Sequence, residues 1–289
     1  MHEAIGIAGT GRIAQALGRA LAEAGERVVA LAGRDGARTH AAAVFAGEGV
    51  EPVLFELLPQ RARHILIAVA DDALEAVARR LAAGGMRGGV ALHTCGSRAP
   101  DALEALARAG VSCGVLHPLQ TVAGAEQGVT ALPGSTFAVA GGEQAVAWAE
   151  EIVAVLKGTA IRVDGAGMPL YHAAAVMASN YVVGLIDAAA MLMAAAGIDG
   201  ETALAALGPL VRAGVRNALA LGPAEALTGP IERGDVETIA RHLRSLASAP
   251  PEAGALYRAA GLYVTGLARR GGLSEKKAAE IGELLRRGR

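Results

Sequence analysis

The sequence predicts an α/β protein in which a mostly parallel sheet domain is followed by an all-α domain. In the first half, apolar runs of strand length alternate with helical stretches, which is typical of a parallel sheet covered by helices on both faces. From residue 165 onward the strand patterns stop, and helical stretches follow one another between glycine and proline breaks. We therefore predict two domains, residues 1–164 and 165–289.

The strands of the first domain are expected at short runs of apolar residues bounded by turn residues. They are residues 3–8, 27–32, 64–69, 90–93, 111–116, 136–140 and 160–163. Helical patterns are expected between them, at residues 13–24, 35–46, 73–83, 101–109 and 143–156. Such helices provide the crossover connections that parallel strands require.

Composition and charge narrow the classes of function. Of the 289 residues, 53% are hydrophobic and 19% charged, which suits a folded chain with sizeable cores. The net charge is −1, from 27 basic and 28 acidic residues, so we expect no nucleic-acid partner. Two cysteines, Cys95 and Cys113, make no disulfide framework, and the N-terminus lacks a signal-peptide pattern. We therefore expect a cytoplasmic protein.

Residues 173–196 are apolar and long enough to suggest a membrane span. They contain Asn180 and Asp187 and have no flanking basic cluster. We therefore expect a buried helix, running unbroken from near Met168 to about Ala196, and no membrane partner.

The first strand ends in a G-x-G-x-x-A turn made by Gly9, Gly11 and Ala14, and a helix pattern begins at once. Gly9 permits a tight turn, Gly11 lets the backbone approach a pyrophosphate, and Ala14 keeps the helix close to the strand. The helix N-terminus adds unpaired N–H groups and a positive dipole. Together these features predict a Rossmann-like, dinucleotide-binding domain over residues 1–164.

The end of the second strand indicates which dinucleotide binds. Enzymes that use NAD usually place an acidic residue there to hold the ribose 2′-hydroxyl, but this chain has Gly33. Arg34 and Arg38 follow, and two guanidinium groups suit a 2′-phosphate by charge and bidentate geometry. The alternative is that both arginines are merely solvated and that Asp35 holds the ribose. We expect NADP(H) rather than NAD(H).

The full set of expected cofactor-binding residues follows from these turns and from the later strand ends. Asp71 and Asp72 are interpreted as caps of the next helix rather than as ligands. The set is Gly9, Thr10, Gly11, Arg12, Ile13, Arg34, Arg38, Val69, Ala70 and Thr94.

Chemistry is expected at the carboxyl ends of the strands, where polar residues cluster. One strand ends His93-Thr94-Cys95-Gly96, and the next ends His117-Pro118-Leu119-Gln120. A zinc site built from these histidines and Cys113 is rejected, because Cys113 and His117 lie about 13 Å apart along an extended strand. We expect no metal.

The long helix of residues 168–196 carries one polar stripe. At about 100° per residue, Ser179, Asn180 and Asp187 all fall within about 80° of His172. A core histidine with inter-helix hydrogen bonds would look the same. Because this is the first helix after the domain boundary, the stripe is able to face the cofactor.

Three motifs resemble a family of predicted oxidoreductases in which a Rossmann-like domain precedes a helical domain of unknown function. They are residues 116–121, residues 171–181 and residues 226–235, and the resemblance covers nearly the whole chain. That family usually has His-Thr-Ser-Gly where this chain has Cys95 in the third place. The layout is more distantly similar to ketopantoate reductase, prephenate dehydrogenase and the β-hydroxyacid dehydrogenases.

The resemblance implies the catalytic groups. His172 stands where the hydroxyacid and ketopantoate enzymes have a lysine, and Asn180 where they have an asparagine. The chain has only three lysines, none at this place. His117, in a His-Pro pair like that of prephenate dehydrogenases, is the second acid/base candidate, and Thr94 completes the catalytic set. A small carboxylate substrate is implied, with candidate anchors Gln120, Arg216, Asn217, Thr228 and Arg233.

We therefore expect an NADP(H)-dependent oxidoreductase that transfers hydride to or from a small carbonyl or hydroxy acid, with ketopantoate as the first substrate to test. A prephenate or arogenate dehydrogenase and a non-catalytic NADP-binding sensor are the alternatives. The alanine-rich helical half, as in related reductases, suggests a homodimer.

Overall fold

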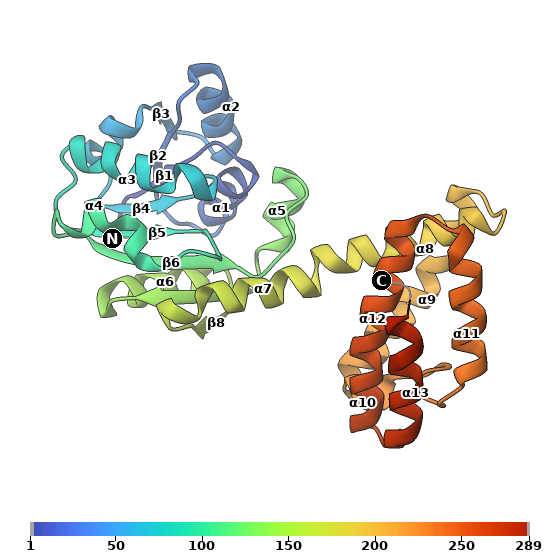
Figure 1. Cartoon of the computed structure of the whole chain (residues 1–289). Coiled ribbons are helices and arrows are strands. Elements are labelled where there is room, and N and C mark those ends of the chain that lie inside the picture. Colours follow the sequence, from blue (N-terminus) through green and yellow to red (C-terminus); the bar gives the residue numbers. More distant parts are fainter. Residues whose placement is uncertain (1–2, 288–289) are drawn as a thin grey trace. The chain divides into compact units, whose positions relative to one another are not determined.

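The computed structural model describes residues 3–287, which divide into two compact units, Met1–Met177 and Ala178–Arg289 (Figure 1). The predicted domain boundary lies earlier in the chain, at the end of the last strand. The structure groups the following segment with the first unit, because the beginning of the next helix packs on the sheet.

The first unit is built on one sheet, in which the described residues form strands in the order β3-β2-β1-β4-β5-β6-β7-β8. All neighbouring pairs are parallel except β6 and β7, which are antiparallel. The Rossmann-like, mostly parallel fold class is thereby confirmed. The strands are β1 (Ile5–Ala8), β2 (Val28–Ala32), β3 (Glu51–Val53), β4 (His64–Ile67), β5 (Val90–His93), β6 (Ser112–Pro118), β7 (Thr136–Gly141) and β8 (Thr159–Arg162).

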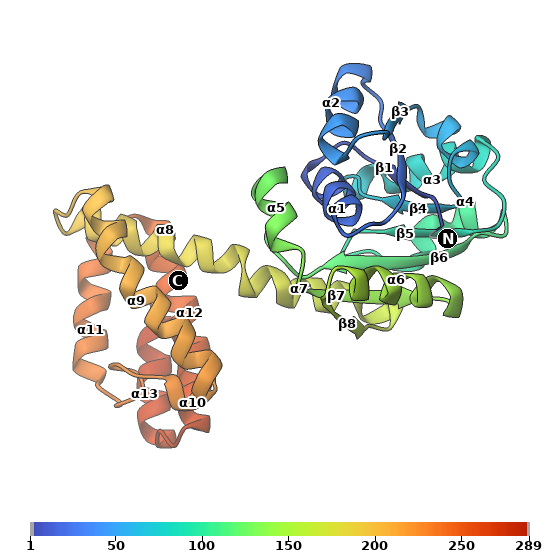
Figure 2. The ribbon, with the colours of Figure 1, turned by 180° about the vertical axis from the view of Figure 1, so that it is seen from behind.

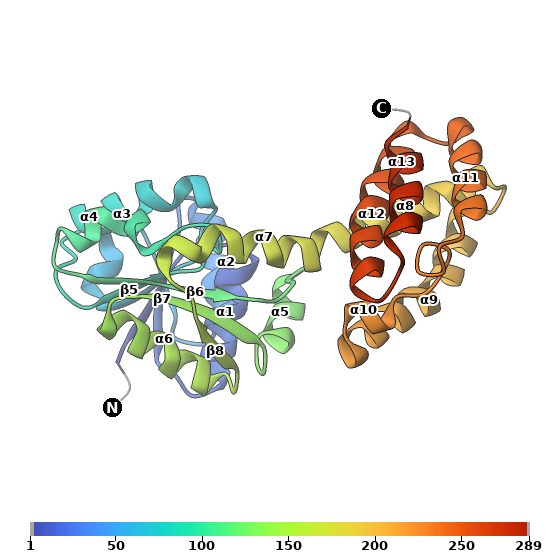
Figure 3. The same cartoon turned by 60° about the horizontal axis from the view of Figure 1, so that its bottom comes forward.

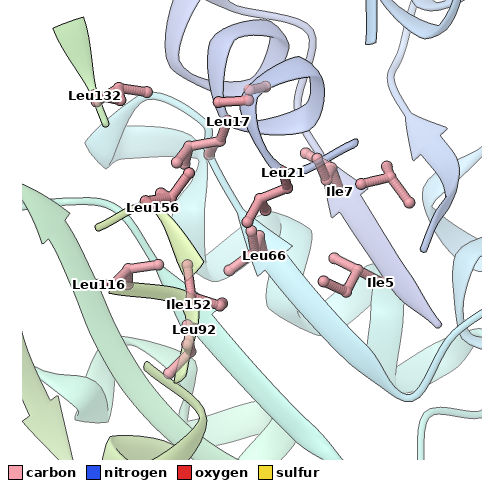
Figure 4. Close-up of a cluster of buried hydrophobic side chains, with 14 of the residues drawn as sticks. Ile5, Ile7, Leu17, Leu21, Leu66, Leu92, Leu116, Leu132, Ile152 and Leu156 are labelled. Carbon is pink, nitrogen blue, oxygen red and sulfur yellow. The ribbon is translucent and has the colours of Figure 1, made fainter. Parts of the chain in front are cut away.

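Helices cover both faces of this sheet, as Figures 1 and 2 show from opposite sides. One core lies under α1, α2 and α6, and Figure 4 shows Leu17 and Leu21 of α1 pointing toward Ile7 and Leu66 of the strands. The other core lies under α3, α4 and the 3₁₀ turn η1. The bounds are α1 (Arg12–Glu23), α2 (Gly36–Ala46), η1 (Phe55–Gln60), η2 (Asp71–Ala73), α3 (Leu74–Ala83), η3 (Pro100–Leu103), α4 (Glu104–Ala107), α5 (Ala125–Ala131) and α6 (Glu143–Val155).

The second unit is all-helical in its described residues. Its buried cluster is small: Ile239 of α11 packs with Ile281 and Leu285 of α13, and partly buried residues of α12 pack against them. The elements are α8 (Asn180–Ala195), α9 (Gly200–Leu221), α10 (Pro223–Ala226), α11 (Val236–Ser245), η5 (Leu246–Ser248), α12 (Pro251–Arg270) and α13 (Glu275–Arg286).

The long apolar helix differs from the prediction in two respects. After the 3₁₀ turn η4 (Gly165–Gly167), helix α7 (Met168–Ala178) ends at Ser179, whose φ of −124° and ψ of −74° interrupt it, and α8 follows. The expectation of burial is also wrong for the single chain, because α8 has no buried residue. Counted through the break, Gly165–Ala195 is long and apolar enough to cross a membrane by length and composition alone.

Candidate functional site

The glycine-rich turn has the conformation that a dinucleotide-binding turn needs. Gly9 has a φ of +135°, and a Cβ on it would collide with the backbone carbonyl of Ala68. Gly11 is the N-cap of α1, and a Cβ on it would meet no atom within 4 Å. Ala14 is fully buried against the sheet. The turn therefore needs glycine at position 9 for packing, whereas position 11 leaves open space at the N-terminus of α1.

A cavity of about 770 Å³ lies over this turn and over the carboxyl ends of the neighbouring strands. The residues expected to bind the cofactor all line it, namely Gly9, Thr10, Gly11, Arg12, Ile13, Arg34, Arg38, Val69, Ala70 and Thr94. The Arg12 guanidinium also donates to the Ala123 carbonyl oxygen at 2.9 Å.

The end of β2 brings Gly33, Arg34 and Arg38 to one side of the cavity. Asp35 does not line it: its carboxylate accepts from the Arg38 backbone N–H at 2.8 Å and caps α2. The carboxylate that could have held a ribose is therefore engaged in helix capping. A Cβ at Gly33 would collide with the hydroxyl of Thr39 and lie 2.6 Å from the Thr10 methyl group, so a side chain at this position would have to displace one or both threonine side chains.

The same wall holds a third arginine that sequence reasoning missed. Arg80 of α3 lines the cavity, pairs with Glu56 through bonds of 2.5 and 2.9 Å, and lies over the Phe55 ring at 4.8 Å. The hydrogen bonds from Arg80 lower the pKa of Glu56. No local pattern marked Arg80, because its partners lie 24 residues away along the chain.

Asp71 lies in the turn after β4 and lines the cavity. Its interpretation as a helix cap is wrong, because neither η2 nor α3 has a side-chain cap. Instead its carboxylate accepts from the Ser97 hydroxyl at 2.6 Å. Burial alone would raise the pKa of Asp71, but the hydrogen bonds from Ser97 and Cys95 hold it below the ordinary value.

Two histidine rings, those of His117 and His172, lie beside Gly96, the residue that follows the cavity-lining residues Thr94 and Cys95. Thr94 and Cys95 line the cavity, and a Cβ on Gly96 would lie 2.6 Å from His117 Nε2 and 2.6 Å from His172 Cδ2. The two rings meet edge to face, with centroids 5.7 Å apart. The structure thus brings three predicted catalytic residues, Thr94, His117 and His172, to one end of the cavity.

Helix α7 supplies His172, and its first turn is anchored on the sheet (Figure 3). Met168 is fully buried in a cluster with Val115 of β6 and Ala140 of β7. Tyr171 packs against the same cluster and its hydroxyl lies 2.9 Å from His117 Nδ1. Tyr171 belongs to the motif of residues 171–181, but its contact with a histidine 54 residues earlier could not be read from the sequence.

Burial sets the protonation of two histidines near this end of the cavity. It lowers the pKa of His117 to about 4, and the neighbouring His172 lowers it further whereas Asp71 opposes the shift. Burial also lowers the pKa of His93 to about 4, despite its Nε2 bond of 3.1 Å to the Ala99 carbonyl. Both rings are therefore neutral at physiological pH.

Gln120 lies on the loop after β6, and both the oxygen and the nitrogen of its side-chain amide form hydrogen bonds with nearby backbone groups. Its Oε1 accepts from the Thr121 backbone N–H at 2.8 Å, and its Nε2 lies 3.4 Å from the Ala131 carbonyl. Its role as a substrate ligand stays a prediction.

The other predicted residues belong to the second unit. Asn180 begins α8, and its side-chain oxygen accepts from the Ser179 hydroxyl at 3.0 Å. The single polar stripe from His172 to Asp187 is wrong, because the helix is broken at Ser179. The anchors Arg216, Asn217, Thr228 and Arg233 are all exposed.

The segment from Thr228 to Asp235 forms a turn that leads into α11. Asp235 caps that helix, with bonds of 3.0 Å from the backbone and 2.7 Å from the hydroxyl of Thr238. Among the described residues no group of three or more His, Cys, Asp or Glu side chains could hold a metal ion.

The strand order, the glycine-rich turn and the cavity above it define a Rossmann-like fold, and comparison with protein families agrees. Residues 2–118 match the model of a Rossmann-like domain, and residues 135–264 match a domain of unknown function, DUF2520. The two matches confirm the predicted order of a Rossmann-like domain followed by a domain of unknown function. A search of curated proteins found no match.

Solved structures share the fold over nearly the whole chain. Protein TM1727 from Thermotoga maritima is 20% identical with a TM-score of 0.71, over 94% of this chain and 99% of that one. BF3122 from Bacteroides fragilis, provisionally named an NADP oxidoreductase, is 22% identical with a TM-score of 0.70, over 98% of both chains. A reductive aminase from Aspergillus terreus, in complex with NADPH and ethyl levulinate, is 19% identical with a TM-score of 0.64, over 100% of both.

Proposed function

We propose that this protein is an NADP(H)-dependent oxidoreductase that transfers hydride to or from a carbon of a small carbonyl or hydroxy acid. One observation carries the proposal. The 770 Å³ cavity over the glycine-rich turn extends to Thr94 and Cys95, and a histidine pair stands beside the next residue, Gly96. A dinucleotide site with titratable groups at one end is the arrangement that hydride transfer coupled to proton transfer needs.

Three features support NADP(H) as the cofactor. Arg34 and Arg38 line the cavity beside Gly33, where guanidinium groups would pair with a 2′-phosphate. Asp35, the only acid in this turn, is engaged as a helix cap. The reductive aminase that shares the fold was solved with NADPH, and BF3122 carries the NADP name.

The nicotinamide, when bound, exchanges the hydride, and the residues of this chain handle the proton. His172 is the first candidate to donate a proton to the substrate oxygen, because its ring stands beside Gly96 next to the cavity lining. His117 is the second candidate. Thr94 and Asn180 would orient the substrate.

Ketopantoate is the first substrate to test. Gln120, Asn217, Thr228 and Arg233 are the proposed carboxylate and amide contacts. An imine is the second candidate substrate, because a reductive aminase shares the fold over the whole chain. A prephenate or arogenate dehydrogenase remains the alternative that relies on His117, and a sensor would bind NADPH without turnover of any of these substrates.

We also propose that the protein is a cytoplasmic homodimer that binds no nucleic acid and no membrane. In the second unit, large apolar side chains of α8 and α9 are exposed in the single chain: Val183 by 68%, Leu210 by 68% and Leu219 by 83%. Apolar patches of this kind are typical of interfaces.

Thermal unfolding with saturating NADPH, with NADH and without ligand tests the cofactor proposal. A ligand at 100 times its Kd adds about 2.7 kcal/mol to the free energy of unfolding, which raises the midpoint by several degrees. We expect that shift with NADPH and a smaller one with NADH. The double variant Arg34→Ala/Arg38→Ala should lose most of the NADPH shift and little of the NADH shift.

The matched control is Arg19→Ala/Arg108→Ala, which removes two arginines that form exposed ion pairs outside the cavity. It should retain the full NADPH shift. No shift with either nucleotide would refute the proposed function, and equal losses for both nucleotides in the double variant would refute the 2′-phosphate assignment.

A further inference from the structure

His117 is held from its Nδ1 side by a tyrosine. The Tyr171 hydroxyl lies 2.9 Å from His117 Nδ1, and the two rings meet edge to face at 86°. The other nitrogen of His117, Nε2, lies 2.6 Å from the position that a Cβ on Gly96 would take. The imidazole therefore turns one nitrogen to Tyr171 and the other to Gly96, next to the cavity lining.

The chemistry of the two groups fixes the direction of this hydrogen bond. A phenol O–H is a stronger acid than a neutral imidazole N–H, and an imidazole nitrogen is a stronger base than a phenol oxygen. The favoured arrangement is therefore O–H donating to Nδ1. Burial raises the pKa of Tyr171 to about 12, so the hydroxyl keeps its proton over the physiological range.

The charged and titratable groups that face His117 do not favour its doubly protonated, cationic form enough to overcome burial. His172 on α7 and His93 on β5 oppose protonation, whereas Asp71 in the turn after β4 favours it. Burial outweighs Asp71, and the pKa of His117 is lowered to about 4. A neutral imidazole that accepts at Nδ1 carries its only proton on Nε2.

We propose that Tyr171 is a positioning residue that fixes neutral His117 as the Nε2–H tautomer, so that His117 presents a hydrogen-bond donor, and not a base, on its Gly96 side. The catalytic role of this tautomer rests on the proposed function. In a carbonyl reduction, His117 Nε2–H polarises the substrate oxygen and keeps its proton, while His172 supplies the proton that the oxygen gains.

Side-chain NMR of the full-length protein tests the tautomer directly. Long-range ¹H–¹⁵N correlations distinguish a protonated ring nitrogen from a bare one, and His117→Gln identifies the His117 signals by their loss. At neutral pH we expect His117 to have a protonated Nε2 and a bare Nδ1. In Tyr171→Phe, which keeps the aromatic ring, we expect the Nδ1–H form of His117 to become populated.

The second unit contains a matched control. The Tyr257 hydroxyl lies 2.9 Å from His242 Nδ1, with ring centroids 5.9 Å apart at 83°, nearly the geometry of the Tyr171–His117 pair. Tyr257→Phe should change the His242 signals and leave those of His117 unchanged. A Nδ1–H tautomer for His117 in the wild type, or no change in Tyr171→Phe, would overturn the proposal. If Tyr171→Phe does not fold, a Nδ1–H tautomer of His117 in the wild-type spectrum still overturns the proposal.

The thermal shift with NADPH separates this inference from the proposed function. A wild-type protein with the expected tautomer and no NADPH shift would refute the oxidoreductase and leave the role of Tyr171 intact. A normal NADPH shift with the opposite tautomer would refute only the role of Tyr171.

Discussion

At the scale of single residues, Gly96 shows how a missing side chain shapes the site. Its backbone follows two residues of the cavity lining and approaches both His117 and His172. Each ring occupies part of the volume that any side chain at position 96 would need. Gly96 therefore sets how closely the histidine pair approaches the proposed nicotinamide position.

The substitution Gly96→Ala should displace both rings and lower turnover of the reductase substrate by roughly 10²-fold, because misplacing a proton-transfer group forfeits much of its contribution. NADPH affinity should change little, since the glycine-rich turn is untouched. Steady-state kinetics and NADPH titration measure the two effects. Gly124→Ala is the control, because a Cβ there meets nothing within 4 Å. Wild-type turnover in Gly96→Ala would contradict the role of the pair.

Site residues could be predicted from the sequence where a polar side chain falls at the end of a predicted strand. Thr94 and His117 lie near the carboxyl ends of β5 and β6, where polar residues of neighbouring parallel strands are expected to meet, and the resemblance to prephenate dehydrogenases adds an acid/base role for His117. The structure places both residues beside Gly96. Tyr171 and Arg80 were missed as site residues. Each depends on a partner far along the chain, Tyr171 on His117 and Arg80 on Glu56. Such pairs form only when the fold is complete.

At the scale of elements, strands β5 and β6 carry two histidines near their carboxyl ends, His93 fully buried and His117 partly buried. His93 is fully buried, and one of its ring nitrogens, Nδ1, is buried without a hydrogen-bond partner among the described residues. His117 bonds Tyr171 through Nδ1. For both rings burial lowers the pKa to about 4, below the value of 6.5 of an exposed histidine. The folded state therefore favours the neutral form of both imidazoles.

The free energy of unfolding should fall as the pH falls from about 6.5 to about 4. In that window the unfolded chain binds more protons than the folded one, so acid favours unfolding, and each histidine contributes at most roughly 3 kcal/mol. Urea unfolding followed by the fluorescence of Trp148, the only tryptophan, reports on the first unit. His93→Gln should flatten this pH dependence, whereas His40→Gln, at an exposed position, should not. An equal slope in His93→Gln would contradict the assignment.

Helices and strands could be predicted from the sequence where a pattern of apolar residues extended over at least four residues. Seven strands were expected and found, and β5 has the expected bounds. β3 was missed because it has only three residues, one of them Pro52, and lies at the sheet edge. The break at Ser179 was missed because residues on both sides are equally apolar and no proline or glycine marks it.

At the scale of the whole molecule, the two units differ in how well they bury their apolar residues. The first has two extensive cores, one on each face of the sheet. In the second, Ile239, Ile281 and Leu285 form the buried cluster, the other buried hydrophobic residues are alanines, and α9 buries only Ala203 over its length. A helix of 22 residues with so little burial in a single chain needs a further contact to account for its apolar sequence.

The protein should sediment at twice its monomer mass of 29.0 kDa at micromolar concentration, because association would cover the exposed side chains of α8 and α9. Leu219→Glu should shift the equilibrium toward the monomer, since a charge in an apolar interface is costly. Val44→Glu, at a residue of the first unit that is 65% exposed, is the control and should remain dimeric. Sedimentation of the wild type at the monomer mass would exclude the homodimer.

The crowding at Gly33 limits how this site could be re-engineered. Exchanging NADP for NAD preference by placing a carboxylate at the end of β2 is the obvious design, but the Thr39 hydroxyl and Thr10 methyl group already fill that space. A lone Gly33→Asp change would push the side chain into α2 and the glycine-rich turn. A design that places a carboxylate at position 33 therefore has to make room at Thr10 and Thr39, for example by smaller side chains at those two positions.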